Sequence, residues 1–307
     1  MTDTSPPTRC GVVAVLGAPN AGKSTLVNQL VGQKVAITSA KAQTTRARML
    51  GIALETLGDG TPVQMILVDT PGIFAPRRRL DRAMVSAAWE GAEAADAVLL
   101  MVDPIKQRRH ELEPLLETLA ARPERKILVL NKVDRARKEP LLALAQELTR
   151  KVNFAEVFFV SALTGEGVPE LKHHLAAMMP EGEWMYPEDQ VSDASERLLA
   201  AEITREQLYQ QLHEELPYDS AVRPERYEVR PDGSVEIHQQ IVVTRDNQRA
   251  IVLGKGGSKI KAIGAAARKE LSEVLGVKVH LFLHVKVLEN WAEDKEIFEE
   301  IGLDWVR

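Results

Sequence analysis

Cysteine is almost absent from this chain of 307 residues, which contains only Cys10. A single cysteine excludes a framework of internal disulfides and any metal site built from several thiolates. Cys10 borders an apolar run, so we expect it to be a small buried residue. The chain also contains no apolar run of about 18 residues, the length that would favour a membrane-spanning helix.

The sequence also lacks a hydrophobic signal segment, because residues 1–9 are polar and include two prolines. With a single cysteine, this predicts a protein of the reducing cytoplasm. The seven histidines form no convincing HxH or HxxxH metal spacing. There is no internal repeat and no low-complexity tract.

Positive charge is scarce overall, since the formal net charge is -5. Taken over the whole chain, this argues against a nucleic-acid binder. The charge is unevenly distributed, with 23 Lys and Arg against 19 Asp and Glu in residues 1–180, and 16 against 25 in residues 181–307. Within the acidic half, residues 245–278 carry eight basic side chains against three acidic ones. A local patch of this kind is what attraction to nucleic acid requires.

Length and hydrophobic pattern predict two domains. Short apolar runs alternate with helix-periodic segments over the first part of the chain, as is typical of a doubly wound α/β domain. The strands are expected at residues 11–16, 64–68, 97–102, 126–130 and 157–160. Open parallel sheets bind ligands at the carboxyl ends of their strands, so functional residues are expected there.

The pattern changes after residue 180. Residues 180–192, rich in Pro, Gly and acidic side chains, predict a linker. A helix from residue 193, a hairpin around residues 231–233, a helix over 260–274 and a strand over 277–287 are expected to follow. Apolar residues at every second position of that strand predict a small sheet covered on one face. The expected divisions are a first domain at 10–179, a linker at 180–192 and an α+β domain at 193–307.

The first expected strand leads into a segment of the form GxxxxGK[ST]. The segment comprises Gly17, Ala18, Pro19, Asn20, Ala21, Gly22, Lys23, Ser24 and Thr25. Its glycines let backbone N–H groups face phosphate oxygens, and the helix that follows adds its dipole. Lys23 is expected to reach the β- and γ-phosphates and Ser24 to ligate Mg²⁺. A chance glycine-rich turn is the alternative, but roughly 0.01 such matches are expected in a chain of this length.

The second expected strand ends in Asp69-Thr70-Pro71-Gly72. The Asp69 carboxylate suits the surroundings of a bound Mg²⁺, and the N–H of Gly72 can sense a γ-phosphate. Taken alone, this tetrapeptide is a common turn. Its place after the phosphate loop, one helix and one strand later, makes it informative.

Asn131-Lys132-Val133-Asp134 follows another apolar strand and predicts which base the bound nucleotide carries. The Asp134 carboxylate can accept hydrogen bonds from guanine N1–H and N2–H₂, whereas adenine would leave the charge unpaired, at a cost of roughly several kcal/mol. Asn131 can pair with the other edge of the base, and the Lys132 stem can lie over the ring. After the last strand, Ser161 and Ala162 offer backbone N–H groups near the guanine oxygen.

With these motifs in this order, residues 10–178 resemble the GTPase domain of the Era family. The matching segments are 17–24, Gln43-Thr44-Thr45-Arg46, 69–72, 131–134 and 160–162. The resemblance implies GTP or GDP and Mg²⁺ as cofactors, with Ser24, Asp69 and Thr45 at the metal and residues 41–48 as switch I; Thr44 is the alternative to Thr45. It implies catalytic roles for Asn20, Lys23, Thr45, Asp69 and Gly72.

The sequence also bears on how water and charge are handled at this site. Ile73 follows Gly72 where many GTPases have a glutamine, and isoleucine cannot hydrogen-bond a water, so the water must be positioned otherwise. Asn20 resembles the asparagine that helps related GTPases bind potassium, which predicts slow hydrolysis stimulated by K⁺. Arg77, Arg78 and Arg79 are more typical of a solvated basic tip than of a phosphate contact.

Near the carboxyl end, a GxxG sequence lies between two helix-like stretches. The GxxG sequence alone is expected by chance once or twice in a chain of this size. Here hairpin, GxxG corner, helix and strand over residues 205–290 resemble a type-2 KH domain, which clamps about four nucleotides of single-stranded nucleic acid. The implied RNA-binding residues are Arg249, Gly254, Lys255, Gly256, Gly257 and Lys259. A helix with a solvated basic face is the alternative.

The placement of two further groups of side chains is expected in this domain. Ile251 and Leu253 either pack near RNA bases or belong to the core. His280, Phe282, His284 and Lys286 are expected on the face of the last strand opposite its apolar row.

The combined resemblance implies a P-loop GTPase domain with a mostly parallel sheet, followed by a smaller α+β type-2 KH domain. It implies a monomeric switch that binds small-subunit (16S) ribosomal RNA near its 3′ end on the 30S subunit and acts in subunit maturation. Peripheral association with the cell membrane is a further family property, which no basic amphipathic helix supports here. The alternatives are a P-loop kinase or ATPase, which would lack the Asp134 base contact, and an RNA-binding adaptor with a vestigial nucleotide site.

Overall fold

The chain divides into two compact units. The computed structural model describes residues 7–39, 41, 44–93, 95–106, 109–212, 216 and 218–306, so Gln43 lies outside the described residues. The first unit contains residues 1–36, 48–76 and 84–193. The second contains residues 194–307 together with the segments 37–47 and 77–83. The sequence does not predict that these two segments group with the second unit.

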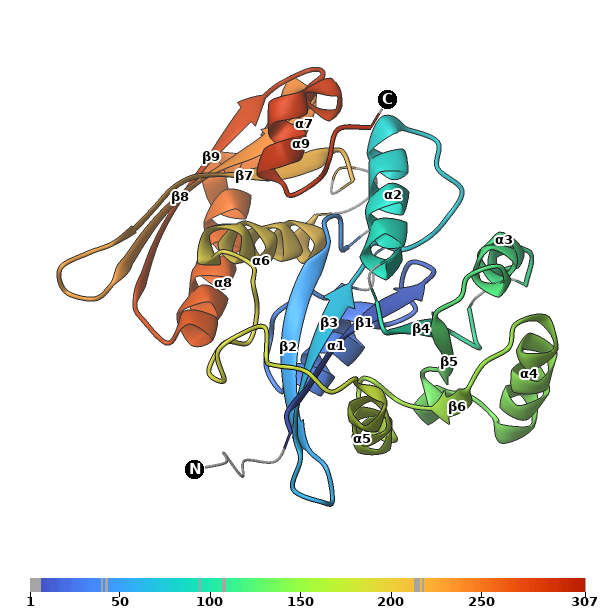
Figure 1. The fold of residues 1–307 in the computed structure, drawn as a ribbon. Coiled ribbons are helices and arrows are strands. Elements are labelled where there is room, and N and C mark those ends of the chain that lie inside the picture. Colours follow the sequence, from blue (N-terminus) through green and yellow to red (C-terminus); the bar gives the residue numbers. More distant parts are fainter. Residues whose placement is uncertain are drawn as a thin grey trace, which may run out of the picture. The chain divides into compact units, whose positions relative to one another are not determined.

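A six-stranded sheet forms the centre of the first unit, in the order β2-β3-β1-β4-β5-β6 (Figure 1). Its strands are β1 (Arg9–Gly17), β2 (Met49–Thr56), β3 (Pro62–Asp69), β4 (Ala97–Val102), β5 (Arg125–Leu130) and β6 (Glu156–Phe159). β2 is antiparallel to β3, and the other neighbours are parallel. The five expected strands are confirmed to within two residues at each end.

The sequence pattern misses β2. Its residues include Gly51 and Ala53, which weaken the apolar alternation of a half-buried strand. The small residue has a packing reason, because a Cβ atom at Gly51 would lie 2.8 Å from Val31 and 3.1 Å from Val27. Close packing of the first helix therefore requires glycine at this position. The missing apolar side chain hides the strand from the sequence pattern.

Helices cover both faces of this sheet. They are α1 (Lys23–Val31), α2 (Arg79–Glu93), α3 (Arg109–Ala120), α4 (Lys138–Lys151) and α5 (Val168–Met178), with a short 3₁₀ helix, η1 (Val133–Arg135). Val13 and Val15 of β1 pack in one core with α1 and α5, whereas Ala14 and Leu16 pack in the other with α3 and α4. Burial on both faces explains why the strands are continuous apolar runs.

The segment 180–192 is fixed to the first unit by a buried glutamine. The Oε1 atom of Gln64 accepts the N–H groups of Met185 and Tyr186 at 3.0 Å, and its Nε2 atom donates to the Tyr186 carbonyl at 2.8 Å. Further along, the Ile52 N–H donates to the Val191 carbonyl at 2.8 Å. The predicted linker therefore lies along the sheet through backbone hydrogen bonds.

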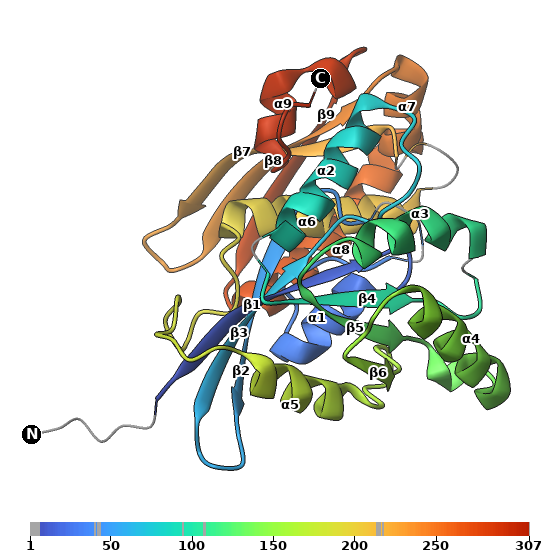
Figure 2. The ribbon, with the colours of Figure 1, turned by 45° about the vertical axis from the view of Figure 1, so that its right-hand side comes forward.

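The second unit has a three-stranded sheet in the order β7-β8-β9, with α6 and α8 packed on one face (Figure 2). Its elements are α6 (Glu196–Gln211), β7 (Ser220–Val229), β8 (Val235–Val243), α7 (Asp246–Leu253), η2 (Lys255–Gly257), α8 (Ser258–Leu275), β9 (Val279–Val287), η3 (Trp291–Glu293) and α9 (Lys295–Glu300). β7 and β8 are antiparallel, and β8 and β9 are parallel. The predicted order of hairpin, helix pair and final strand is confirmed.

The other face of this sheet carries polar and aromatic side chains, as predicted. Phe282, His284 and Lys286 of β9 are exposed, and the Phe282 ring stacks on His238 of β8 with a centroid distance of 4.6 Å. The prediction for Cys10 is also confirmed, because it is buried and unpaired among the described residues. Within the same residues, no helix is long and apolar enough to cross a membrane.

Gln239 offers a test of packing in the second unit. Its side chain is fully buried in β8, and neither amide atom has a hydrogen-bond partner among the described residues. A buried amide without partners costs about 1–3 kcal/mol, so Gln239→Met, which keeps the shape, is expected to raise the free energy of unfolding by about 1 kcal/mol in urea titrations.

Gln240 provides the matched control. Its Nε2 donates to Glu225 at 3.0 Å and lies 2.9 Å from His284 Nε2, and only its Oε1 lacks a partner among the described residues, so Gln240→Met is expected to raise stability less than Gln239→Met or to lower it. A loss of stability in Gln239→Met would show instead that this amide is hydrogen-bonded in solution, for example by an enclosed water.

Candidate nucleotide and nucleic-acid sites

The glycine-rich loop between β1 and α1 closes tightly on itself and on its neighbours. Gly17 and Gly22 have φ values of 152° and 101°. A Cβ atom at Gly17 would lie 2.3 Å from the Met101 carbonyl, and one at Gly22 would lie 2.3 Å from Asn131 Nδ2. α1 starts directly after Gly22, a residue with no side chain to cap the first N–H groups. Those N–H groups and the helix dipole suit an anion.

Lys23 is buried in this loop, with 6% of its surface exposed. Its Nζ donates to the carbonyls of Gly17 and Ala18 at 3.1 and 3.0 Å. Burial lowers the pKa of Lys23 from 10.5 to about 8, and the nearby charge of Asp69 opposes this shift only in part. The site therefore holds a cation that lacks full compensation, as a phosphate-binding loop requires.

Ser24 and Asp69 meet at the ends of α1 and β3. The Ser24 hydroxyl donates to Asp69 Oδ2 at 2.6 Å, and Asp69 is fully buried. A hydroxyl and a carboxylate are hard oxygen donors, which Mg²⁺ prefers. No cluster of three or more His, Cys, Asp or Glu side chains suited to a metal occurs in the described part of the chain. The pair thus fits a Mg²⁺ that completes its shell with further oxygen ligands, including those of phosphate and water.

The segment after β3 packs directly on the phosphate loop. A Cβ atom at Gly72 would lie 2.6 Å from the backbone nitrogen of Pro19. The Ile73 N–H donates to the Gly17 carbonyl at 3.0 Å, and its side chain packs against the apolar core. Thr70 is fully buried, and its hydroxyl donates to the Val15 carbonyl at 2.6 Å. Only glycine fits at Gly72.

Asn131 connects the loop after β5 to two other loops. Its Nδ2 donates to the Ala21 carbonyl at 2.7 Å, and its Oδ1 accepts the Ala162 N–H at 2.9 Å. Both bonds are buried. The Ser161 N–H also has a partner, the Glu166 carbonyl at 2.9 Å. That Ser161 and Ala162 offer backbone N–H groups to a base stays a prediction.

Lys132 spans the candidate base site. Its backbone is left-handed, with φ 64°, and its Nζ donates to the Asn20 carbonyl at 2.9 Å and to Asp103 Oδ2 at 2.6 Å. Burial opposes ionisation of Asp103, but hydrogen bonds from Lys132 and two backbone N–H groups outweigh it and lower the pKa of this carboxyl. Asp134 follows in η1 and is exposed.

Segment 37–47, which includes Thr44 and Thr45 of the predicted switch I, belongs to the second unit. Thr45 is buried, and the Thr44 carbonyl accepts a hydrogen bond from Arg205 of α6. Arg46 is 2% exposed and donates to the carbonyls of Ser220 and Tyr218 at 2.7 and 3.0 Å. Its buried guanidinium therefore holds this segment at the start of β7.

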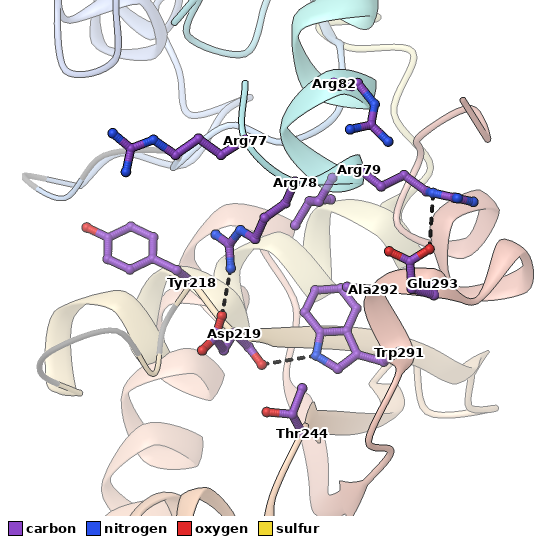
Figure 3. A pocket seen from close by; sticks show the side chains of 11 residues that line it. Arg77, Arg78, Arg79, Arg82, Tyr218, Asp219, Thr244, Trp291, Ala292 and Glu293 are labelled. Atoms are coloured by element: carbon purple, nitrogen blue, oxygen red, sulfur yellow. Dashed lines mark hydrogen bonds and ion pairs between the residues drawn. The ribbon is translucent and has the colours of Figure 1, made fainter. Parts of the chain in front are cut away.

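Segment 77–83 approaches the turn that precedes β7, in a pocket of about 340 Å³ (Figure 3). Arg78 pairs with Asp219 at 2.8 Å, and Arg79 pairs with Glu293 at 3.1 Å. The Trp291 indole donates to the Asp219 carbonyl at 3.0 Å. Arg77 and Arg78 are exposed, as the predicted solvated tip requires, although Arg78 is ion-paired, whereas Arg79 is partly buried.

The GxxG corner between α7 and α8 has an open backbone. Gly254, Gly256 and Gly257 all have positive φ. A Cβ atom at Gly254 would clash with Lys259, whereas one at Gly256 or Gly257 would contact none of the described residues within 4 Å. Lys255 and Arg249 are exposed, and Lys259 is partly buried. Ile251 is 54% exposed, so its assignment to the core is wrong; Leu253 is partly buried.

A cavity of about 350 Å³, here called the apolar groove, runs beside this corner between α8 and β9. It is lined by Ile260, Lys261, Gly264 and Arg268 of α8 and by Leu281 and Leu283 of β9. Apolar floors with cationic rims suit nucleobases whose phosphates lie at the edge.

The groove, the position of Asp103 at the site and the burial of Arg46 are not predicted from the sequence. Asp103 had a signal, since it directly follows the strand 97–102 and lies where ligand contacts are expected. The groove and the burial of Arg46 depend on segments far apart in the sequence, so no local pattern identifies them.

Comparison with known proteins agrees with both sites. A family model described as a 50S ribosome-binding GTPase matches residues 12–132, and a KH-domain model matches residues 215–292. A crystal structure of Aquifex aeolicus Era with GDP and AlF₄⁻ has a TM-score of 0.89 and 37% identity, covering 96% of this chain and 99% of that one. A crystal structure of Era with MgGDPNP and nucleotides 1506–1542 of 16S ribosomal RNA matches with the same values.

Curated relatives match over nearly the full length. GTPase Era of Rhizobium meliloti is 54% identical over 99% of this chain and 98% of its own length. GTPase Era of Erythrobacter litoralis is 84% identical over 97% of this chain and 98% of its own length. Identity at this level, across both units and the segments that join them, means that the chain belongs to the Era family of GTPases.

Proposed function

We propose that this GTPase is a switch that binds small-subunit (16S) ribosomal RNA near its 3′ end and acts in maturation of the 30S subunit. The observation that carries this proposal is the likeness, over nearly all of both chains, to the Era structure that contains nucleotides 1506–1542 of 16S ribosomal RNA. We further propose that it works as a monomer in the cytoplasm. A peripheral contact with the inner face of the cell membrane is carried over from the family resemblance alone.

In the proposed nucleotide site, the phosphate loop from Gly17 to Thr25 holds the phosphates. Lys23 offers its charge to the β- and γ-phosphates, and Ser24 and Asp69 would hold Mg²⁺ together with Thr45. The metal, when bound, neutralises charge on the phosphate oxygens. Gly72 packs on Pro19 of the phosphate loop, which supports the proposal that its N–H lies near the γ-phosphate.

The proposed base site discriminates guanine through Asp134. Its carboxylate is exposed in η1 and accepts hydrogen bonds from two donors on guanine. Lys132 supports the base through its stem, and Asn131 fixes the loops around it through buried bonds to Ala21 and Ala162. These buried bonds make Asn131 a residue that positions the loops of the base site.

In the proposed RNA site, Gly254, Lys255, Gly256 and Gly257 approach the phosphodiester chain, with Arg249 and Lys259 adding charge. The open space beside Gly256 and Gly257 supports close approach of a backbone. An RNA-binding adaptor with a vestigial nucleotide site is the second candidate function. Turnover of GTP distinguishes the switch from the adaptor.

Nucleotide affinity is expected to depend on pH through Lys23. Phosphate charge favours the protonated lysine and raises its pKa from about 8, so binding takes up a proton above that pH. The affinity for GDP is expected to be flat from pH 7 to nearly 8 and to fall by up to about tenfold per pH unit above it. Titrations with a fluorescent nucleotide over this pH range measure the affinity. The Lys23→Met variant should bind weakly, and its affinity should depend less on pH. Equal slopes of log affinity against pH in both proteins would contradict the role of Lys23.

Single-turnover hydrolysis of GTP tests the switch against the adaptor. We expect slow turnover that is faster in K⁺ than in Na⁺, because Asn20 is proposed to help bind a cation that neutralises charge between the phosphates. Asn20 has φ 63°, so Asn20→Gly removes the side chain without backbone strain, and the K⁺ preference should disappear. Equal rates in both salts for the wild-type protein would reject the potassium site, and no turnover in any salt or with 30S subunits would leave the adaptor.

The RNA site is tested at Gly256. Its φ of 60° is tolerated by Asp and Asn, so Gly256→Asp and Gly256→Asn should both fold. The aspartate places a negative charge beside the RNA backbone and is expected to lower affinity for a single-stranded 16S 3′-end oligonucleotide by roughly tenfold or more, whereas the neutral asparagine should have a much smaller effect. Fluorescence anisotropy measures both, and equal affinities for wild type and Gly256→Asp would argue against this site.

A further inference from the structure

Asp103 lies at the candidate base site but belongs to none of the motifs from which the nucleotide site is predicted. It is the first residue after β4, and only 5% of its surface is exposed. Val102 pairs with Leu130 in the parallel register of β4 and β5, so Asp103 stands beside the loop that contains Lys132. A buried carboxylate at a ligand-binding sheet edge needs partners that compensate for its burial.

One oxygen of this carboxylate belongs to a local turn. Its Oδ1 accepts the N–H of Ile105 at 2.9 Å and the N–H of Lys106 at 3.2 Å. Aspartate commonly binds the backbone two residues further on in this way, and asparagine and serine form similar turns. The turn fixes the orientation of the carboxylate and leaves its second oxygen for another partner.

The second oxygen binds Lys132. The Lys132 ammonium lies 2.6 Å from Asp103 Oδ2, with 27% and 6% of the two side chains exposed. Burial opposes ionisation of this carboxyl, yet hydrogen bonds from Lys132 and from the turn hold its pKa below the ordinary value. A short, largely buried pair of this kind holds a lysine more firmly than an exposed ion pair, which water and salt screen.

Lys132 also reaches the phosphate loop. Its Nζ donates to the Asn20 carbonyl at 2.9 Å, so the far end of the side chain is held by two loops at once. A lysine side chain has many rotamers, and ordering it costs entropy. Because Nζ is fixed within the protein, the stem is ordered before a base packs against it. Without the carboxylate, this ordering cost would fall on the binding step.

We propose that Asp103 is a positioning residue of the nucleotide site, which holds Lys132 in the orientation that the base requires. This inference rests on the proposed base site and adds to it a residue from outside the recognition motifs. Asp103 acts on the nucleotide through Lys132 rather than by contact. Loss of its charge therefore weakens nucleotide binding only while Lys132 is present.

A role in the turn alone is the competing explanation, and the Asp103→Asn variant separates the two. The amide oxygen can still accept the N–H groups of Ile105 and Lys106, so the turn is kept. The amide nitrogen then faces Lys132, and two donors cannot bond to each other. Asp103→Ser acts in the same way, because its hydroxyl can serve the turn but is too short to replace the carboxylate at Lys132.

The test is a double-mutant cycle in the full-length protein, with Asp103→Asn, Lys132→Met and the two combined. Titrations with fluorescent GDP in the presence of Mg²⁺ measure the affinity of each protein. Asp103→Asn is expected to lower the affinity roughly three- to tenfold, the effect of ordering one long side chain on binding. Lys132→Met should lower it at least as much, and adding Asp103→Asn to Lys132→Met should cause no further loss.

Asp96→Asn is the control for loss of charge. Asp96 precedes β4 at the opposite end of the strand, is exposed, and accepts the Val12 N–H through Oδ2 at 2.8 Å. This variant should bind GDP as the wild type does. Urea titrations measure whether each variant is folded, and Asp103→Ser replaces Asp103→Asn if the latter is unfolded. Unfolding of both variants would show that Asp103 supports the fold itself and would overturn the proposal.

Two results of the cycle would overturn the positioning role while the base site stands. One is a loss of affinity from Asp103→Asn that persists in the Lys132→Met background, which would assign Asp103 to the turn. The other is an unchanged affinity in Asp103→Asn beside a loss in Lys132→Met. If neither variant changes the affinity, the proposed contact between Lys132 and the base is overturned as well. Failure of the wild type to bind GDP would overturn the nucleotide site itself.

Discussion

The buried amide of Asn131 holds the nucleotide-binding end of the first unit together. It accepts the N–H of Ala162 and donates to the carbonyl of Ala21, so the loops after β1, β5 and β6 share one side chain. In a buried environment the loss of either partner leaves a polar group unsatisfied, at a cost of about 1–3 kcal/mol. The glycine requirement at Gly22 follows from the same contact, because any Cβ there would collide with the amide. The side chain of Asn131 thus links the phosphate motif and the base motif, so neither loop can change its structure without the other.

Close to Asn131, burial destabilises the charged form of Lys23, and a bound polyphosphate would stabilise it again. The pKa of Lys23 lies at about 8 instead of 10.5, so below pH 8 its charged form costs the folded protein roughly 3 kcal/mol, a cost that disappears as the pH rises toward 10.5. Asp69 compensates only part of this, since its carboxylate also accepts the Ser24 hydroxyl. An anionic ligand restores the missing compensation, which links nucleotide binding to stability of the same loop.

The sequence predicts those parts of the molecule that depend on local pattern. Continuous apolar runs locate β1, β3, β4, β5 and β6, because burial on both faces leaves few polar positions in them, such as Gln64 and Lys126. Motif spacing locates Lys23, Ser24, Asp69 and Asn131 at strand ends. It does not locate β2, where packing against α1 requires Gly51, nor the bond from the Ala162 N–H to the side chain of Asn131. Tertiary contacts decide both cases, and they leave no periodic signal.

The least predictable feature is that the second unit includes two segments that follow nucleotide motifs in the chain. Arg46 and Arg78 come from these segments, and both bind the turn from Tyr218 to Ser220, where β7 begins. Any movement of residues 37–47 that frees Arg46 gives up its bonds to two carbonyls, on the order of a few kcal/mol. A ligand shifts a conformational equilibrium only by its differential interaction with the two states. The bonds of Arg46 therefore set the scale of the differential interaction that a ligand would need in order to release this segment from β7.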